Sequence, residues 1–180
     1  MDAGAPVLET ARLRLRAHRR DDLSDCAAMW GDERVARFIG GKPATVEEAW
    51  SKILRYAGLW SLLGFGYWAV EEKGSGRFVG EVGFADFRRD ITPSLGDEPE
   101  AGWVLAPWAH GVGFATEAVR AMHVWSDAHL RTSSTVCIID PENARSIGLA
   151  QKCGYREFAR STYKGGPAVL FRRGARGAQR

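Results

Sequence analysis

The run LAPWAHGVGFATEAVRAM, residues 105–122, limits the possible fold of this chain more than any other segment. An apolar stretch ends at Pro107, which cannot continue a β-ladder, and a helical pattern of apolar residues begins after Gly113. Gly111 and Gly113 lie between them. Closely spaced glycines cost conformational entropy, so their presence indicates that the main chain itself has a task. The sequence therefore predicts a strand, a tight turn and a helix in succession.

The predicted turn has the properties of an anion site. The first turn of a helix presents amide N–H groups without intrahelical partners, and the helix dipole is positive at that end. Because glycine lacks a Cβ, a phosphate can approach the backbone closely. The expected donors are the amides of Val112, Gly113, Phe114, Ala115 and Thr116.

Two well-known phosphate motifs do not fit this turn. A P-loop would end in Gly-Lys-Ser/Thr, which is absent from the segment. A dinucleotide fingerprint would need a third glycine or alanine where Thr116 stands, inside a βαβ unit near the start of the chain. The turn therefore calls for a different phosphate-binding motif.

The rest of the chain reads as one α/β domain, residues 1–174, with a disordered tail at 175–180. Residue periodicity predicts the order strand, two helices, three strands, helix, strand, helix and two strands. Helices interleave with a mostly antiparallel meander, so a mixed sheet is expected. The predicted strands are 11–18, 65–72, 77–87, 100–107, 134–140, 155–163 and 166–173, and residues 91–99 are predicted to form an exposed loop.

Several residues are predicted to cap helices. Asp21 or Asp22 precedes the first helical segment, and Asp140 precedes the last one. Thr45 and Glu48 have the spacing of a capping box, in which side chain and backbone satisfy each other.

Composition excludes several functional classes. The chain has 180 residues, is 45% hydrophobic and carries a formal net charge of +3. No segment reaches the ~20 apolar residues that cross a bilayer, and the first residues do not resemble a secretory signal, so no membrane partner and a cytoplasmic location are expected. Five arginines lie within residues 12–20, but no nucleic-acid-binding module accompanies them. We interpret them as a solvated strand face and expect no nucleic-acid partner, although a mildly basic surface suits a polyanionic ligand.

Three cysteines, Cys26, Cys137 and Cys153, are widely spaced. Without a CxxC pair they predict neither a metal site nor a redox motif, and in apolar runs they behave as small hydrophobes. A nucleophilic Cys-His pair stays open as an alternative, because such partners meet in space rather than in sequence.

Four segments, in order, resemble the GNAT family of N-acetyltransferases: LETARLRLRAHRRDDL, GEVGF, EAGWVLAPWAHGVGFATEAV and NARSIGLAQKCGY. The resemblance is greatest to the subgroup of ribosomal-protein alanine and serine acetyltransferases (RimJ/RimL type). The family's acyl-CoA loop, Arg/Gln-x-x-Gly-x-Gly/Ala, corresponds here to a run that begins at His110 and ends at Ala115. Taken by itself, this run also fits a glycine turn before a surface helix.

The resemblance implies the GNAT fold, with acetyl-CoA as cosubstrate. The cosubstrate would lie where the sheet splays between the fourth strand, around Trp103, and the fifth, around Val136. Backbone groups of Trp103, Val104 and Leu105 would pair with the pantetheine arm, and a free N–H there would polarise the thioester carbonyl. Asn143 would hydrogen-bond the pantetheine or, alternatively, satisfy N–H groups at the start of its own helix.

The implied reaction moves an acetyl group from a thioester to an amine. Glu100 is the first candidate for the general base, directly or through water, with an ordinary exposed carboxylate as the alternative; Glu81 is the second. Many relatives have a tyrosine acid where this chain has Ala150, so that role is vacant. Ser146 matches the serine that the subgroup resemblance implies, which would hydrogen-bond the sulfur. His110 replaces the usual Arg or Gln, which makes one phosphate contact absent or pH-dependent.

The amine acceptor is left open between a protein N-terminus, an amino acid, a polyamine and a drug. It is expected between the early helices and the final hairpin, where core packing is the alternative role for several aromatic residues: Trp30, Phe38, Trp50, Trp60, Phe65 and Trp68. Trp108 would be a lid or a cover for the cofactor. The acidic run 96–100 would attract a cationic amine or form a solvated turn.

Two other functional classes stay open, a non-catalytic acyl-CoA sensor and a nucleotide-binding redox or structural module. The chain is expected to be a monomer or a homodimer.

Overall fold

The computed structural model describes residues 4–175. They form one eight-stranded sheet in the order β1-β2-β3-β4-β5-β6-β8-β7, in which β5 and β6 are parallel and the other neighbours antiparallel. The strands are β1 (Leu8–Glu9), β2 (Leu13–Arg16), β3 (Tyr67–Glu72), β4 (Phe78–Ala85), β5 (Glu100–Leu105), β6 (Ser134–Ile139), β7 (Arg156–Tyr163) and β8 (Gly166–Gly174).

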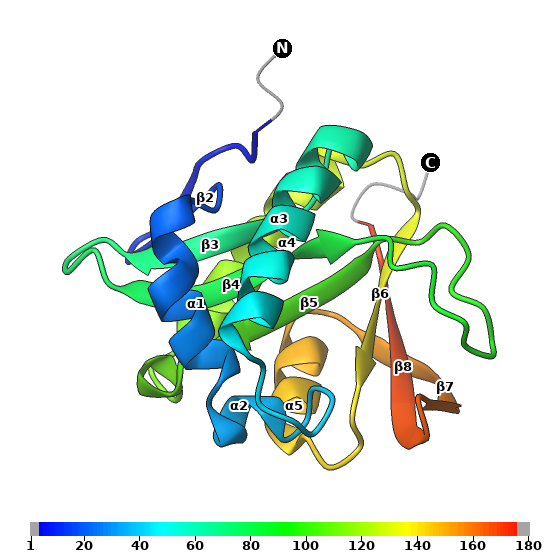
Figure 1. Cartoon of the computed structure of the whole chain (residues 1–180). Helices are drawn as coiled ribbons and strands as arrows, with labels where there is room; N and C mark the ends of the chain where they lie inside the picture. Colours follow the sequence, from blue (N-terminus) through cyan, green and yellow to red (C-terminus); the bar gives the residue numbers. More distant parts are fainter. Residues whose placement is uncertain (1–3, 176–180) are drawn as a thin grey trace.

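Helices cover both faces of the sheet, with α1 and α3 on one side and α4 on the other (Figure 1). The helices are α1 (Leu23–Trp30), α2 (Glu33–Ala36), α3 (Val46–Leu63), α4 (Phe114–His129) and α5 (Ala144–Lys152), with 3-10 turns η1 (Arg20–Asp22) and η2 (Pro107–Ala109). Phe84 of β4 and Met122 of α4 belong to the core on the α4 side, whereas Cys26 and Ile53 belong to the core on the α1–α3 side.

The predicted fold class and order of elements are confirmed, and the pattern missed the short elements β1, α2 and η2. Ala175, the first residue of the predicted tail, donates its N–H to the Ser133 carbonyl at 2.9 Å. Residues 176–180, the rest of that tail, lie outside the described residues, so the domain boundary stays a prediction. No helix in residues 4–175 has the length and apolar character needed to cross a membrane.

One predicted cap is confirmed and two are wrong. Thr45 and Glu48 form the capping box of α3, with hydrogen bonds of 2.7 and 3.2 Å. Asp22 precedes α1, but its carboxylate accepts from Arg16 rather than from the helix. The residue that caps α5 is Asn143, because Asp140 instead caps the turn before the helix.

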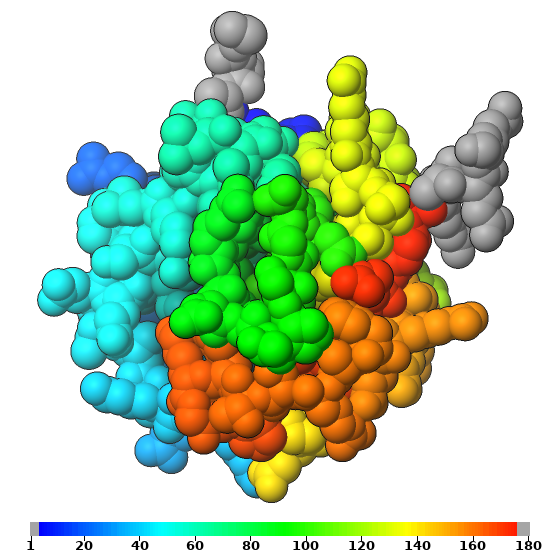
Figure 2. All heavy atoms as spheres, turned by 90° about the vertical axis from the view of Figure 1, so that its right-hand side faces the viewer, coloured from blue at the N-terminus to red at the C-terminus, as the bar shows by residue number. Residues whose placement is uncertain are grey.

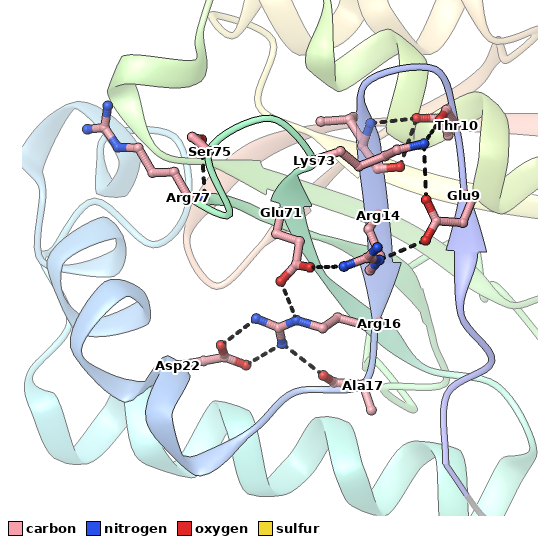
Figure 3. A network of polar contacts seen from close by, with 11 residues as sticks. Glu9, Thr10, Arg14, Arg16, Ala17, Asp22, Glu71, Lys73, Ser75 and Arg77 are labelled. Carbon is pink, nitrogen blue, oxygen red and sulfur yellow. Dashed lines mark hydrogen bonds and ion pairs between the residues drawn. The ribbon is translucent and has the colours of Figure 1, made fainter.

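The arginines of β2 are engaged in ion pairs at the sheet edge (Figure 3). Arg16 is 7% exposed and donates to Asp22 at 2.8 Å and to Glu71 at 2.7 Å. Arg14 contacts Glu9 at 2.7 Å and Glu71 at 3.0 Å. The interpretation of this strand face as solvated is therefore wrong for Arg16, which a buried acid balances.

The segment 91–99 is also less exposed than predicted. Ile91 and Leu95 are 6% and 9% exposed and pack with Val136 and Leu170 of β6 and β8. These two apolar anchors fix the loop over that half of the sheet.

The sheet splays between β5 and β6, as the family resemblance implies. Strands β4 and β5 pair along six residues, whereas β5 and β6 share one register pair within residues 4–175, Glu100 with Val136. Beside it, the Val136 N–H donates to the Pro99 carbonyl at 3.1 Å. Figure 1 shows the two strands diverging from that point. The edge of β5 beyond Glu100 is thus left without a neighbouring strand.

Candidate active site

The glycine turn lies directly after β5 and η2, and its residues 110–113 are exposed. Gly111 and Gly113 have φ of 78° and 88°, the left-handed region that glycine adopts without strain. Gly113 is the N-cap of α4, and no side chain caps this helix. We call residues 110–116 the donor loop.

Among the described residues, the amides of residues 112–116 have no hydrogen-bond partner. The first intrahelical bond of α4 runs from the Glu117 N–H to the Gly113 carbonyl at 3.1 Å, so the three amides of 114–116 have no partner in the helix. Among the described residues, no group accepts from the amides of Val112 and Gly113. The donors predicted for a phosphate therefore lie together at the positive end of a 16-residue helix.

Arg12 holds the donor loop in place, a role that the sequence did not reveal. Its Nε donates to the Glu117 carboxylate at 2.7 Å and its Nη1 to the Val112 carbonyl at 2.9 Å. Its guanidinium carbon also lies 4.6 Å from the centre of the Phe114 ring. A residue predicted to face solvent thus ties β2 to the head of α4 and brings a positive charge there.

His110 is turned back toward β5. Its Nε2 lies 2.9 Å from the Leu105 carbonyl oxygen. A phosphate contact by His110 would require the imidazole to leave this carbonyl, and the predicted contact stays untested.

Backbone direction along β5 narrows the predicted pantetheine partners. The Ala106 N–H donates to the Val79 carbonyl of β4 at 2.9 Å. The Val104 carbonyl oxygen also faces β4, so close to Gly80 that a Cβ built on this glycine would lie 2.2 Å from it. Both residues thus direct their polar groups toward β4. Because these directions alternate along an antiparallel strand, Trp103 and Leu105 direct theirs toward the gap. The prediction for the Val104 backbone is therefore wrong.

The start of α5 lies beside β5. The Trp103 indole N–H donates to the Ser146 hydroxyl at 3.2 Å, and the Ser146 N–H donates to Asn143 Oδ1 at 3.1 Å. Asn143 is the N-cap of α5, which confirms the alternative of a local helix-start role and leaves its amide nitrogen for a ligand. Ala150 is fully buried, so the position of the family's tyrosine is filled by core.

Glu100 is neither exposed nor free. It is 7% exposed, and Arg89 donates to its two carboxylate oxygens at 2.5 and 2.7 Å. The alternative of an ordinary exposed carboxylate is thus wrong, while the predicted role as base stays untested.

Glu81 lies on the same face of the sheet, because Glu81 opposes Val104 and Glu100 opposes Ala85 in one register. It is fully buried and accepts from Cys26 at 3.2 Å, Trp30 at 3.0 Å and Tyr56 at 3.2 Å.

Burial would raise the pKa of Glu81, but contacts from its neighbours outweigh it. His18 Nε2 lies 3.4 Å from one carboxylate oxygen. His18, together with the donors Trp30 and Cys26, holds the pKa of Glu81 below its ordinary value. The buried carboxylate is therefore ionised at neutral pH.

The neighbours of Glu81 include a cysteine and a histidine, Cys26 and His18, which is the kind of pair that the sequence left open. The donor atoms of His18, Cys26 and Glu81 lie within 4.8 Å of one another, close enough to ligate a metal ion. Burial, followed by the charge of Glu81, raises the pKa of the Cys26 thiol. The thiol is therefore protonated and donates to Glu81, so the arrangement does not fit a thiolate nucleophile.

Two of the six predicted acceptor aromatics lie in the core instead. Trp60 and Trp68 pack edge to face with Trp125 in the core on the α4 side. The Trp108 indole donates to the Phe78 carbonyl at 3.2 Å, so it is fastened to β4 and is not a free lid. Trp30 does lie on the face that carries Glu81.

Known proteins resemble this chain over most of its length. A model of the acetyltransferase (GNAT) domain matches residues 12–156. The Bacillus subtilis protein YoaA, described as an uncharacterized N-acetyltransferase, is 25% identical over 153 residues, which cover 84% of each chain.

Solved structures have the same fold. A Bordetella pertussis protein assigned to the GNAT family is 29% identical, covers 94% of this chain and 99% of its own, and superposes with a TM-score of 0.82. Spermidine N-acetyltransferase from Vibrio cholerae, solved with CoA and spermine, is 17% identical, with coverages of 95% and 100% and a TM-score of 0.73. Ribosomal-protein acetyltransferases are also structural neighbours, at 13% to 19% identity, which is a likeness of fold.

Proposed function

The chain belongs to the GNAT acetyltransferase family, and from this premise we propose that it transfers an acetyl group directly to a primary amine of a small molecule or a protein N-terminus. Membership makes it an acetyl-CoA-dependent acetyltransferase. The observation that carries the proposal is the group of unpaired amides at the head of α4, directly beside the open edge of β5.

The residues present fit acetyl-CoA. A Cβ on Gly111 would meet nothing within 4 Å, so an anion has room at the donor loop. We propose that the diphosphate is bound by the amides of residues 112–116, with Arg12 adding positive charge nearby. The pantetheine would pair with Trp103 and the N–H of Leu105, since the Leu105 carbonyl already accepts from His110. The free amide nitrogen of Asn143 is proposed as a further donor.

When bound, acetyl-CoA supplies a thioester whose carbonyl carbon an amine can attack, with loss of the thiol. The backbone N–H of Trp103, directed into the gap, is proposed to hydrogen-bond the carbonyl oxygen of the thioester, where negative charge develops. A preformed donor of this kind needs no rearrangement during the reaction. The amine would approach from the face that carries Glu81 and Glu100.

We propose that Glu100 takes the proton of the amine, through a water or after Arg89 moves aside, and that Glu81 is the second candidate. Both oxygens of each carboxylate already have partners. A base engaged in this way still transfers protons if one partner is displaced when substrate binds, because catalytic hydrogen bonds rearrange in the substrate complex.

Ser146 is proposed to hydrogen-bond the departing sulfur. Its hydroxyl accepts from the Trp103 indole, which leaves the hydroxyl proton free to point elsewhere. A serine is too weak an acid to protonate a thiolate fully, so solvent would supply the proton.

The proposal is tested by thiol release from acetyl-CoA in the presence of a panel of amines, with a gain of about 42 Da in the amine detected by mass spectrometry. Acetylation of at least one amine by the enzyme, above a blank without it, is expected. CoA binding without transfer to any amine would overturn the proposal in favour of an acyl-CoA sensor, a function consistent with the occupied oxygens of Glu100 and Glu81.

The ribosomal-protein subgroup, the cytoplasmic location and the monomeric or homodimeric state are retained as proposals.

A further inference from the structure

The three acidic residues of the run 96–100 are each paired with an arginine. Asp97 pairs with Arg88 at 3.1 Å, and Glu98 pairs with Arg172 at 2.7 Å. Glu100 pairs with Arg89. Each carboxylate of the run that is predicted to attract a cationic amine thus has an arginine partner, and Arg88 also pairs with Asp86 at 2.8 Å.

Three cations across from this run have no such partner. They are Lys52 and Arg55 of α3 and Lys164 at the β7–β8 turn, named here the acceptor-side cations. Within residues 4–175, none of them lies within ion-pair distance of a carboxylate. These three positive charges are therefore not balanced by a paired carboxylate.

Aromatic rings connect these cations across three elements. The Lys52 ammonium lies 3.8 Å from the centre of the Trp30 ring. Phe87 lies between Arg55 and Arg89, at 5.2 and 4.6 Å. Figure 2 shows the 86–99 loop, in green, between α3, in cyan, and the β7–β8 hairpin, in orange.

Tyr163 continues the series toward the hairpin. Its ring lies 5.0 Å from the Arg89 guanidinium and 5.5 Å from the Lys164 ammonium. The acceptor-side cations therefore belong to one surface and are not scattered lysines.

Lys52 lies next to the face of the sheet that carries Glu81 and Glu100. Trp30, on which its ammonium rests, donates to Glu81. Burial, followed by the charge of Arg55, lowers the pKa of Lys52 although the charges of Glu81 and Glu48 oppose this shift; Lys164 adds a smaller lowering effect. An ammonium that has lost part of its hydration beside other cations gains when an anion binds.

We propose that the acceptor is a small amine that carries its own carboxylate, as an amino acid does, and that Lys52 binds this carboxylate while Arg55 and Lys164 attract it. The inference rests on the proposed acetyl transfer and names its substrate class. A carboxylate held at Lys52 would place the attached amine near Glu81 and Glu100, the proposed proton acceptors. A polyamine would meet three unmatched positive charges, and like charges repel.

The test compares amines that differ in one charge. Each of a panel of L-amino acids and its carboxamide would be assayed with acetyl-CoA, together with spermidine and a neutral peptide with a free N-terminus. For the amino acid that is used best, kcat/KM is expected to be at least about 10-fold higher than for its carboxamide, because one charged contact contributes about this much. A carboxamide, spermidine or peptide used equally well or better would overturn the proposal.

Variants locate the effect. Lys52→Met keeps the side-chain stem and removes the charge, so it is expected to reduce the carboxylate preference to about 2-fold or less, mainly through KM. Lys152→Met, at an exposed position at the end of α5, is the matched control and is expected to retain the preference. If Lys52→Met lowers kcat/KM equally for the amino acid and for its carboxamide, Lys52 supports the structure and binds no carboxylate.

A binding measurement separates this proposal from the proposed catalysis. Calorimetry in the presence of CoA would compare an N-acetyl-L-amino acid with its carboxamide. Tighter binding of the carboxylate, abolished in Lys52→Met, supports the carboxylate site even if no amine is acetylated. Equal affinities overturn it even if acetyl transfer occurs.

Discussion

The two sides of β5 are built in different ways. On the side where CoA is proposed to bind, called here the donor side, the amides proposed to bind the diphosphate come from one short run, residues 112–116. On the acceptor side, the cations come from α3 and from the β7–β8 turn, more than 100 residues apart in the sequence. A site made of consecutive backbone groups can be read from local sequence, whereas a site made of distant side chains needs the fold.

The largest effect that separates the two sides is expected for Glu100→Gln. If Glu100 takes the amine proton, kcat falls by about 100-fold, while CoA affinity is unchanged because the donor loop is untouched. Steady-state kinetics and CoA calorimetry measure the two quantities. Glu98→Gln, which also breaks an ion pair with an arginine, is the control. Equal losses in both variants would mean that the loss follows from breaking an ion pair.

The next effect belongs to the donor side. Gly113→Val places a β-branched residue at a φ of 88°, and its Cβ would lie 3.2 Å from Arg12 Nη2. Strain of this kind, together with crowding of the phosphate, is expected to weaken CoA binding by about 30-fold. Gly58→Val, where a Cβ meets nothing within 4 Å, should leave CoA affinity unchanged. Retained affinity in Gly113→Val would argue against the donor loop.

A smaller change is expected for Arg12→Ala. Its ion pair with Glu117 is half-exposed, and such pairs contribute up to about 1 kcal/mol, so CoA affinity should fall by about 5-fold as the loop loosens. Arg14→Ala removes ion pairs at the sheet edge and should leave that affinity unchanged. Titration of each variant with CoA provides the comparison, and equal affinities in the two variants would contradict a role for Arg12 at the loop.

Ser146→Ala should have the smallest effect. Removing one neutral hydrogen bond, worth ~0.7 kcal/mol, is expected to lower kcat by about 3-fold. Exposed Ser133→Ala serves as the control in the same assay. A loss of 100-fold or more would instead assign Ser146 a role in protonating the sulfur.

Local rules predicted most of the fold. The alternation of apolar and charged residues predicted β2, the Thr45–Glu48 spacing predicted the start of α3, and the glycine pair predicted the start of α4. Failures occurred where a local preference lost to a distant partner. Asp22 has the sequence position of a cap, but Arg16 takes its carboxylate because a buried guanidinium needs a balancing charge.

The site was predictable to the same extent. The donor loop followed from glycine stereochemistry and helix ends, both of which are local. That Arg12 reaches α4, and that Arg89 reaches Glu100, depends on tertiary contacts across 105 and 11 residues of sequence. No spacing rule links such pairs, so neither partner could be named in advance.

The single register pair between β5 and β6 divides the sheet into two panels joined at one corner. A ligand that pairs with the free edge of β5 would act as a temporary strand and complete the sheet. Filling the seam would then stiffen both panels at once, and slower amide exchange should spread from residues 102–105 and β6, which border the seam, into β8, which does not.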